Sequence, residues 1–212
     1  MKKIIVSFMV SFLIIFISTG IFAETSKNYA IVKLGIYNPM SDDLSNNNED
    51  PGFNFGLGFN GATGYGRYFT KWLALEATLG YAETNESEGT KYGYLIVHQP
   101  EATIHIMPIL VNLKFLFPIS YPLGNISPFA EAGLGGYFSW VDVTGESGKN
   151  DFEPGFHIGT GADFDLTKLI FVGLDLRYIW SYADYNYHHE GGYDYNLNLN
   201  GLTATVDFGF RF

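Results

Sequence analysis

Single charged residues interrupt runs of this 212-residue chain in which apolar residues otherwise alternate with small or polar ones. Successive side chains of a strand point to opposite faces, so a charge between apolar neighbours lies on the face opposite to theirs. The residues placed in this way, basic and acidic in equal number, are Lys33, Arg67, Lys114, Arg177 and Arg211 with Glu76, Glu131, Asp163, Asp175 and Asp207. Because a buried charge is tolerated only when it is paired and hydrogen-bonded, we expect these side chains to form one ion-pair network.

Histidine is the side chain used most often in acid–base catalysis, so each histidine is a catalytic candidate. The sequence holds His98, His105, His157, His188 and His189. We expect His105 and His157 to hydrogen-bond inside the fold. His188 and His189 lie among acidic residues that could bind a divalent metal, but adjacent histidines in an extended segment point apart, which favours a solvated loop. None lies in a His-x-Ser pattern, so we predict no catalytic residue, no metal ligand, no cofactor and no enzymatic activity.

The elements that would position these residues are strands, because each run has a period of two and polar segments separate the runs. We expect strands at 29–37, from 53 onward, and at 72–81, 94–117, 129–140, 155–164, 169–182 and 202–212. Long acidic connections at 38–52, 82–93, 142–154 and 183–195 alternate with shorter ones near 70–71, 118–127 and 165–168. This alternation predicts an all-β, eight-stranded antiparallel up-and-down barrel with every long connection at one end.

Two interruptions of the alternation predict β-bulges, where one extra residue shifts the faces of a strand. A bulge at Gly61 would turn Arg67 toward the interior. A bulge at Met107–Pro108 would place Ile104 and Ile106 on the same outer face as the apolar residues that follow the proline.

The run at 202–212 is apolar on one face and carries Asp207 and Arg211 on the other. A barrel with an apolar outer face and a charged inner face is typical of a transmembrane barrel, whereas a soluble lipocalin-type barrel has the opposite polarity. The terminal phenylalanine with aromatic residues at alternate preceding positions resembles the closing strand of bacterial outer-membrane β-barrels. The resemblance implies that Phe208, Phe210 and Phe212 are an assembly signal read by the outer-membrane assembly machinery.

The resemblance extends along the chain. Its segments are GRYFTKWLALEATLGY (66–81), MPILVNLKFLF (107–117), SPFAEAGLGGYF (127–138), GADFDL (161–166), VGLDLRYIW (172–180) and the final strand. They are similar to the small bacterial outer-membrane β-barrel domain family that includes OmpX-like and OmpW-like proteins. Membership implies a location in the cell outer membrane, with lipid and lipopolysaccharide as partners.

Residues 1–23 are predicted to be a signal peptide. Lys2 and Lys3 precede an apolar run at 4–16 and smaller residues at 18–20, and we expect cleavage after Ala23. An uncleaved anchor helix is the alternative, although the apolar run is short for a membrane span. The remaining residues, 24–212, would form the barrel domain.

Charge and composition exclude several classes of function. The formal net charge is −10, which is unsuited to binding nucleic acid, and the absence of cysteine excludes disulfides and thiolate metal sites. Most of the 22 acidic residues lie in the four long connections. There they could bind the divalent cations that bridge lipopolysaccharide phosphates, or they could simply be solvated.

Two functions are consistent with such a barrel. An eight-stranded barrel has an interior just wide enough for its own side chains, which favours a closed protein that acts in outer-membrane structure or surface interaction. A narrow channel for small solutes is the alternative, and it is what the OmpW-like resemblance implies. A lipid A-modifying enzyme is less favoured than either.

Overall fold

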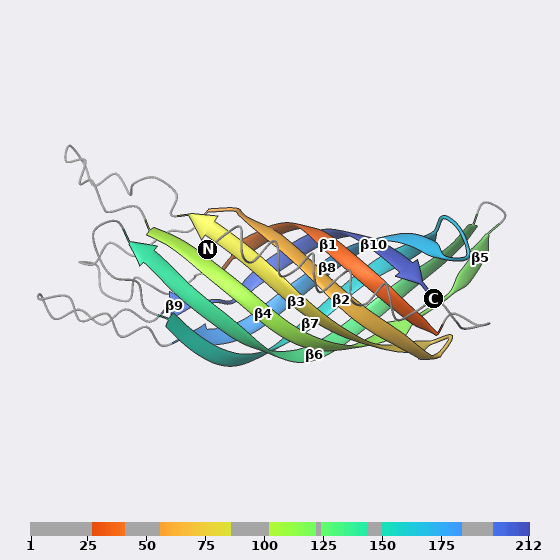
Figure 1. The fold of residues 1–212 in the computed structure, drawn as a ribbon, viewed down its shortest axis with the longest axis horizontal. Helices are drawn as coiled ribbons and strands as arrows, with labels where there is room; N and C mark the ends of the chain where they lie inside the picture. Colours follow the sequence, from red (N-terminus) through yellow and green to blue (C-terminus); the bar gives the residue numbers. More distant parts are fainter. Residues whose placement is uncertain (1–26, 41–55, 86–101, 122–123, 144–149, 184–196) are drawn as a thin grey trace, which may run out of the picture.

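The computed structural model describes residues 27–40, 56–85, 102–121, 124–143, 150–183 and 197–212, and these residues form one closed barrel (Figure 1). The long strands are β1 (Asn28–Pro39), β2 (Gly58–Thr70), β3 (Leu73–Asn85), β4 (Ala102–Leu116), β6 (Gly124–Val143), β7 (Asn150–Asp165), β8 (Ile170–Ala183) and β10 (Gly201–Arg211). Two short strands, β5 (Ile119–Tyr121) and β9 (Leu197–Asn198), extend the wall by pairing with β6 and β8. The prediction of an eight-stranded antiparallel barrel is confirmed.

Each long strand pairs with its neighbours in the chain, and pairing of β10 with both β8 and β1 closes the ring. The closing pair runs from Tyr29 opposite Arg211 to Pro39 opposite Gly201. Asn28 and Phe212 then exchange two backbone hydrogen bonds, of 3.2 Å and 2.9 Å. The last residue is therefore held by the first strand, which leaves the barrel without an open edge.

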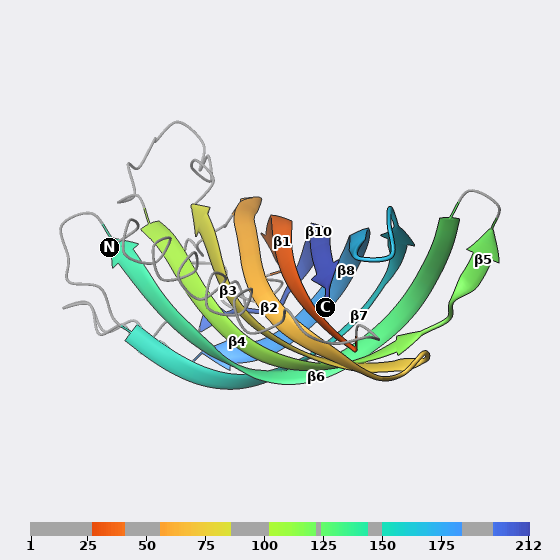
Figure 2. The same ribbon diagram turned by 45° about the vertical axis from the view of Figure 1, so that its right-hand side comes forward.

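One end of the barrel, where β1 begins and β10 ends, carries the short turns and is called the short-turn end; the opposite end is called the long-loop end. Figure 2 shows that β5 and the first residues of β6 extend beyond the neighbouring strands at the short-turn end. The predicted signal peptide, the start of the second expected strand at Phe53, residues 94–101 of the fourth, and His98, His188 and His189 lie outside the described residues.

Alternation along the strands separates an apolar outer face from the interior. On β1, Leu34 and Ile36 are 48% and 43% exposed, whereas Ile31 and Lys33 on the other face are almost completely buried. A continuous apolar surface of this kind is unfavourable in water and suits the hydrocarbon layer of a membrane. No helix among the described residues is long and apolar enough to cross a membrane.

The bulge expected at Gly61 is wrong. β1 and β2 pair in one unbroken register, with Gly61 opposite Leu34 and Asn28 opposite Arg67, and the register shift in this part of β2 lies later, between Tyr68 and Thr70. Without an extra residue the alternation continues, so Arg67 lies on the exposed outer face with Phe59. Arg67 is therefore not part of the interior.

The bulge expected at Met107–Pro108 is also wrong. Leu79 lies opposite Ile109 and Ala82 opposite Ile106, which is the same register on both sides of the proline, and the pairing of β4 with β6 shows no shift. The Pro108 ring is accommodated beside Gly80, where an added Cβ would lie only 2.9 Å from the proline Cγ. The faces of β4 consequently do not change, and Ile104 and Ile106 lie inside the barrel rather than outside.

The pairing of Phe212 with Asn28 leads to a test of the proposed assembly signal. We expect deletion of Phe212 and the variant Phe212→Ala both to lower the amount of barrel assembled in the outer membrane of cells, because both remove the terminal aromatic ring. Phe212→Ala keeps the backbone pair with Asn28. It should therefore refold from urea into detergent almost as well as the wild type.

The amount of folded barrel in isolated outer membranes is the measurement, with heat-modifiable gel mobility as the readout of folding. Normal assembly of Phe212→Ala in cells would contradict the recognition role of the ring. If Phe212→Ala refolds as poorly in detergent as it assembles in cells, the ring acts through the stability of the barrel and not through recognition.

Candidate functional site

The interior of the described barrel has three layers. An apolar layer near the long-loop end is formed by Tyr37, Ala82, Ile104, Ile106, Leu110, Tyr137, Ile179 and Leu199. A second apolar layer near the short-turn end is formed by Tyr29, Ile31, Ala74, Leu116, Phe129 and Phe171, with Tyr68 packed against it. The buried charged side chains lie between them, since on β1 Lys33 follows Ile31 and precedes Tyr37, and on β8 Asp175 and Arg177 lie between Phe171 and Ile179.

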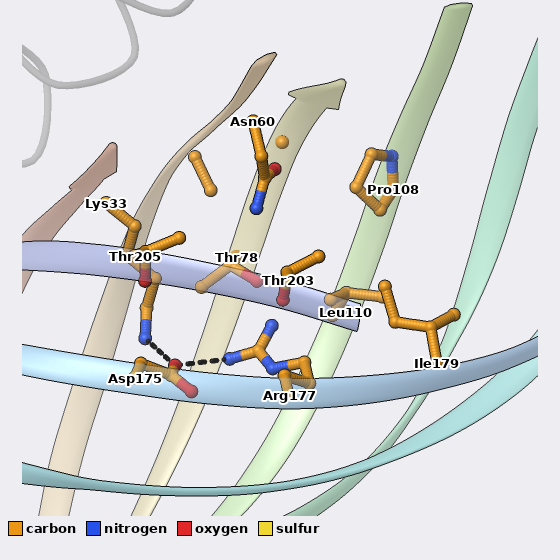
Figure 3. Close-up of a pocket in the computed structure, with 12 residues that line it drawn as sticks. Lys33, Asn60, Thr78, Pro108, Leu110, Asp175, Arg177, Ile179, Thr203 and Thr205 are labelled. Carbon is orange, nitrogen blue, oxygen red and sulfur yellow. Dashed lines mark hydrogen bonds and ion pairs between the residues drawn. The ribbon is translucent and has the colours of Figure 1, made fainter. Parts of the chain in front are cut away.

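Lys33 is the centre of the charged layer. Its Nζ donates to Asp175 Oδ2 at 2.7 Å and to Asp207 Oδ2 at 3.0 Å, and it lies 3.3 Å from Glu76 Oε1. These carboxylates come from β8, β10 and β3, so one ammonium group from β1 links strands that lie on both sides of it in the wall. Figure 3 shows the Lys33 side chain reaching Asp175, which in turn contacts Arg177.

Arg177 extends the network to β6. Its Nε donates to Glu131 Oε1 at 2.7 Å, and its terminal Nη2 lies 2.6 Å from the same oxygen and 2.9 Å from Asp175 Oδ2. Gly159 separates Glu131 and Arg177 along the wall. A Cβ at Gly159 would lie 3.0 Å from Glu131 Oε1, so the glycine leaves the space through which the two charged side chains meet.

Lys114 and Asp163 form a neighbouring pair, with Lys114 Nζ 3.2 Å from Asp163 Oδ2 and 3.7 Å from the centre of the Phe129 ring. Uncharged partners complete the layer. Tyr29 donates to Glu76 at 2.9 Å, and Asn112 donates its amide hydrogen to Glu76 at 3.4 Å. The Asn112 carbonyl oxygen lies 2.5 Å from Nε2 of His157, which is buried inside the barrel as expected.

The structure thus joins Lys33, Glu76, Glu131, Asp175, Arg177 and Asp207 in one set of contacts, which we call the Lys33 network. Arg211 does not reach it. Its guanidinium pairs with Asp165 at 2.7 Å and lies 4.5 Å above the Phe171 ring at the short-turn end. Arg67 is on the outer face, so the prediction of a single network of ten charges holds for only part of the set.

Two partners of these charges were missed in the sequence. Tyr29 has the same parity as Lys33 on β1 and could have been found from that alone. Asp165 is assigned to a turn by its sequence context, yet it is the last residue of β7 and faces Arg211. The contact between these two strand ends depends on the pairing of β7 and β10 with the same strand, β8, which alternation within a strand does not report.

His105 lies on the outer face, not inside as expected. Its Nδ1 is 2.8 Å from the Tyr81 hydroxyl and its Nε2 is 3.2 Å from Asp142 Oδ2, and its ring stacks on Trp140 with centroids 5.1 Å apart. The unbroken register of β4 explains the change, since His105 alternates with the inward Ile104 and Ile106. Among the described residues, no group of three or more His, Cys, Asp or Glu side chains could hold a metal ion.

A small cavity lies in the charged layer. A cavity of about 30 Å³ lies beside Lys33 and Arg177 and is bounded by Asn60, Pro108 and Thr203 (Figure 3). This volume accommodates only a few water molecules. The apolar layers lie on both sides of it, so the arrangement can hold strands together but offers little room for a substrate.

We expect Glu76→Ala to lower the free energy of unfolding by about 3 kcal/mol, because it leaves the buried Tyr29 hydroxyl and the buried Asn112 amide without their acceptor. Urea unfolding of the refolded barrel, followed by tryptophan fluorescence, is the measurement. Asp142→Ala is the control, and because the Asp142 side chain is 67% exposed it should cost well under about 1 kcal/mol. Equal midpoints for Glu76→Ala and the wild type would argue against the burial of Glu76.

The barrel resembles solved outer-membrane proteins in fold. The outer membrane protein OprG of Pseudomonas aeruginosa is 15% identical and superposes with a TM-score of 0.60 over 89% of this chain and 97% of its own. Neisserial surface protein A is 14% identical, with a TM-score of 0.51 over 87% and 94% of the two chains. The outer membrane protein W of E. coli is 16% identical over 90% and 100%, with a TM-score of 0.44.

The two likenesses with TM-scores of 0.60 and 0.51 show a shared fold, and at these identities they carry no activity to this chain. No curated protein sequence matches the chain as a relative. The family model that describes the outer membrane protein beta-barrel domain matches residues 9–212, which is nearly the whole sequence. The chain therefore belongs to the outer membrane protein β-barrel domain family and is a protein of the outer membrane.

Proposed function

We propose that this protein is a closed barrel that acts in outer-membrane structure and through its surface and long loops, and that it does not pass solutes through its lumen. The observation that carries the proposal is the filling of the interior, where two apolar layers enclose a charged layer. A solute crossing the lumen would have to displace buried aromatic and aliphatic side chains at both ends.

The contacts of the charged layer support a structural role. The Lys33 network joins side chains from β1, β3, β6, β8 and β10, and the separate pair of Lys114 and Asp163 joins β4 to β7. Opening a path through this layer would separate buried opposite charges, which is costly in a low-dielectric interior. All the ion pairs of the charged layer together therefore keep the lumen closed.

The long connections are the part of the chain that would meet the cell exterior. Their acidic residues would attract cations, including the divalent ions that bridge the phosphates of lipopolysaccharide. Lipid, lipopolysaccharide and the assembly machinery are thus the partners that this proposal requires, and the proposal assigns the chain no reaction.

We expect the refolded wild-type protein to give no steady single-channel current in planar lipid bilayers, because the lumen is filled at both ends. Heat-modifiable gel mobility of the same sample shows that the barrel is folded. Thr203→Trp, which would fill the cavity beside Arg177, is the matched variant. Steady currents in the wild type that Thr203→Trp abolishes would establish a luminal channel and contradict the proposal.

The role of the acidic loops is tested by calorimetric titration of Ca²⁺ or Mg²⁺ into the refolded barrel. We expect heat of binding that decreases when Asp42, Asp43, Glu49 and Asp50 are changed to Asn or Gln, because these residues lie in one long acidic connection. The variant should fold as well as the wild type. Identical, negligible heats for both proteins would mean that the loops are only solvated and bind no cation.

A further inference from the structure

The Lys33 network contains more carboxylates than cations. The ammonium of Lys33 and the guanidinium of Arg177 face the four carboxylates of Glu76, Glu131, Asp175 and Asp207. The nearby Lys114 and Asp163 balance each other. If every carboxylate were ionised, the network would carry a formal excess of two negative charges.

This excess cannot be dispersed into solvent. Glu76 and Asp207 have no exposed surface, and Glu131 and Asp175 are 4% and 5% exposed. The apolar layers lie on both sides of the network along the barrel axis. Two uncompensated charges in such a compartment are strongly unfavourable, because burial removes their hydration and their mutual repulsion is poorly screened.

The hydrogen bonds of the same layer also show a deficit of donors. Glu131 Oε2, Asp175 Oδ1 and His157 Nδ1 are buried and receive no hydrogen bond. The Asn112 carbonyl oxygen beside Nε2 can only accept, so Nε2 carries a proton and Nδ1 of the neutral ring is an acceptor. No side chain of the ionised network donates a hydrogen bond to any of these three atoms.

We propose that the barrel interior binds two protons, one on Glu131 and one shared by the carboxyl groups around Lys33. Glu131 carries the first because Arg177, the only cation that pairs with it among the described residues, is shared with Asp175, and because Oε2 has no donor. The second belongs to the Lys33 set because one ammonium serves three carboxyl groups there. Protons are favoured over metal ions, since no described cluster could hold a metal and the cavity is small.

The groups that face these protons come from most of the wall. They are Tyr29 and Lys33 on β1, Glu76 on β3, Asn112 and Lys114 on β4, Glu131 on β6, His157 and Asp163 on β7, Asp175 and Arg177 on β8, and Asp207 on β10. The folded protein then holds two protons at neutral pH that the unfolded chain releases. The folding equilibrium constant should consequently fall about 100-fold for each unit of rising pH in the neutral range.

Infrared spectroscopy of the folded barrel in D₂O at neutral pH tests the proposal directly, because a protonated carboxyl has a C=O stretch distinct from that of a carboxylate. We expect this band in the folded wild type and not in urea. Labelling with ¹³C-glutamate should shift the Glu131 component, and Glu131→Gln should remove about half of the band. Asp42→Asn, which removes an acid outside the described barrel, is the control and should leave the band unchanged.

Urea unfolding at several pH values provides the second arm. Glu131→Gln should reduce the pH dependence from about 100-fold to about tenfold per unit, since it removes one of two protons. Absence of the protonated band in the folded wild type would overturn the proposal. Stability that instead rises with Na⁺ or K⁺ concentration would show that metal ions balance the charge, and a band unaffected by either ¹³C-glutamate or Glu131→Gln would overturn the assignment to Glu131.

Discussion

An eight-stranded barrel encloses so little space that charged side chains inside it must be stabilised by one another rather than by water. In this protein Lys33 meets that constraint by contacting three carboxylates from three other strands. The glycines of the wall follow from the same constraint, as at Gly159, where a side chain would block the approach of Glu131 to Arg177. The crowding that closes the lumen is thus also what brings the charges into contact.

The two apolar layers separate the charged layer from both ends of the barrel. They place aromatic and aliphatic side chains between the charges and both ends of the barrel, so that the charges lie in a low-dielectric compartment. A barrel with polar side chains along its whole length would allow water to reach the charges. Here the balance of charge has to be achieved within the layer, by pairing and, as we propose, by bound protons.

Much of the fold follows from the period-two pattern. The pattern predicts every long strand, the inward direction of residues such as Lys33, Glu76 and Asp175, and the apolar outer face, because each depends only on neighbours in the same strand. The prediction is wrong at the two places where an interruption of the alternation predicts a β-bulge. Gly61 lies opposite Leu34 in an unbroken register, and Pro108 lies in a regular strand because Gly80 in the partner strand leaves room for its ring.

Which residue types fill the interior is harder to predict than which side chains of a charged strand point toward it. Ile104 and Ile106 face inward because the long-loop end of the lumen is apolar, and a strand pattern does not reveal which of two faces is the interior when both carry apolar residues. The position of Arg211 depends on the meeting of Asp165 and Phe171 at the short-turn end. Such contacts depend on how the neighbouring strands β7, β8 and β10 pair, which a pattern within one strand does not report.

The central claim is that Lys33 and its carboxylates act as one buried unit. A double-mutant cycle of Lys33→Met and Asp175→Asn, measured by urea unfolding of the refolded barrel, tests it most directly because these side chains contact at 2.7 Å. We predict a coupling energy of about 1–3 kcal/mol, with the double variant more stable than the sum of the single effects would give. Additive effects of the two substitutions would contradict the account.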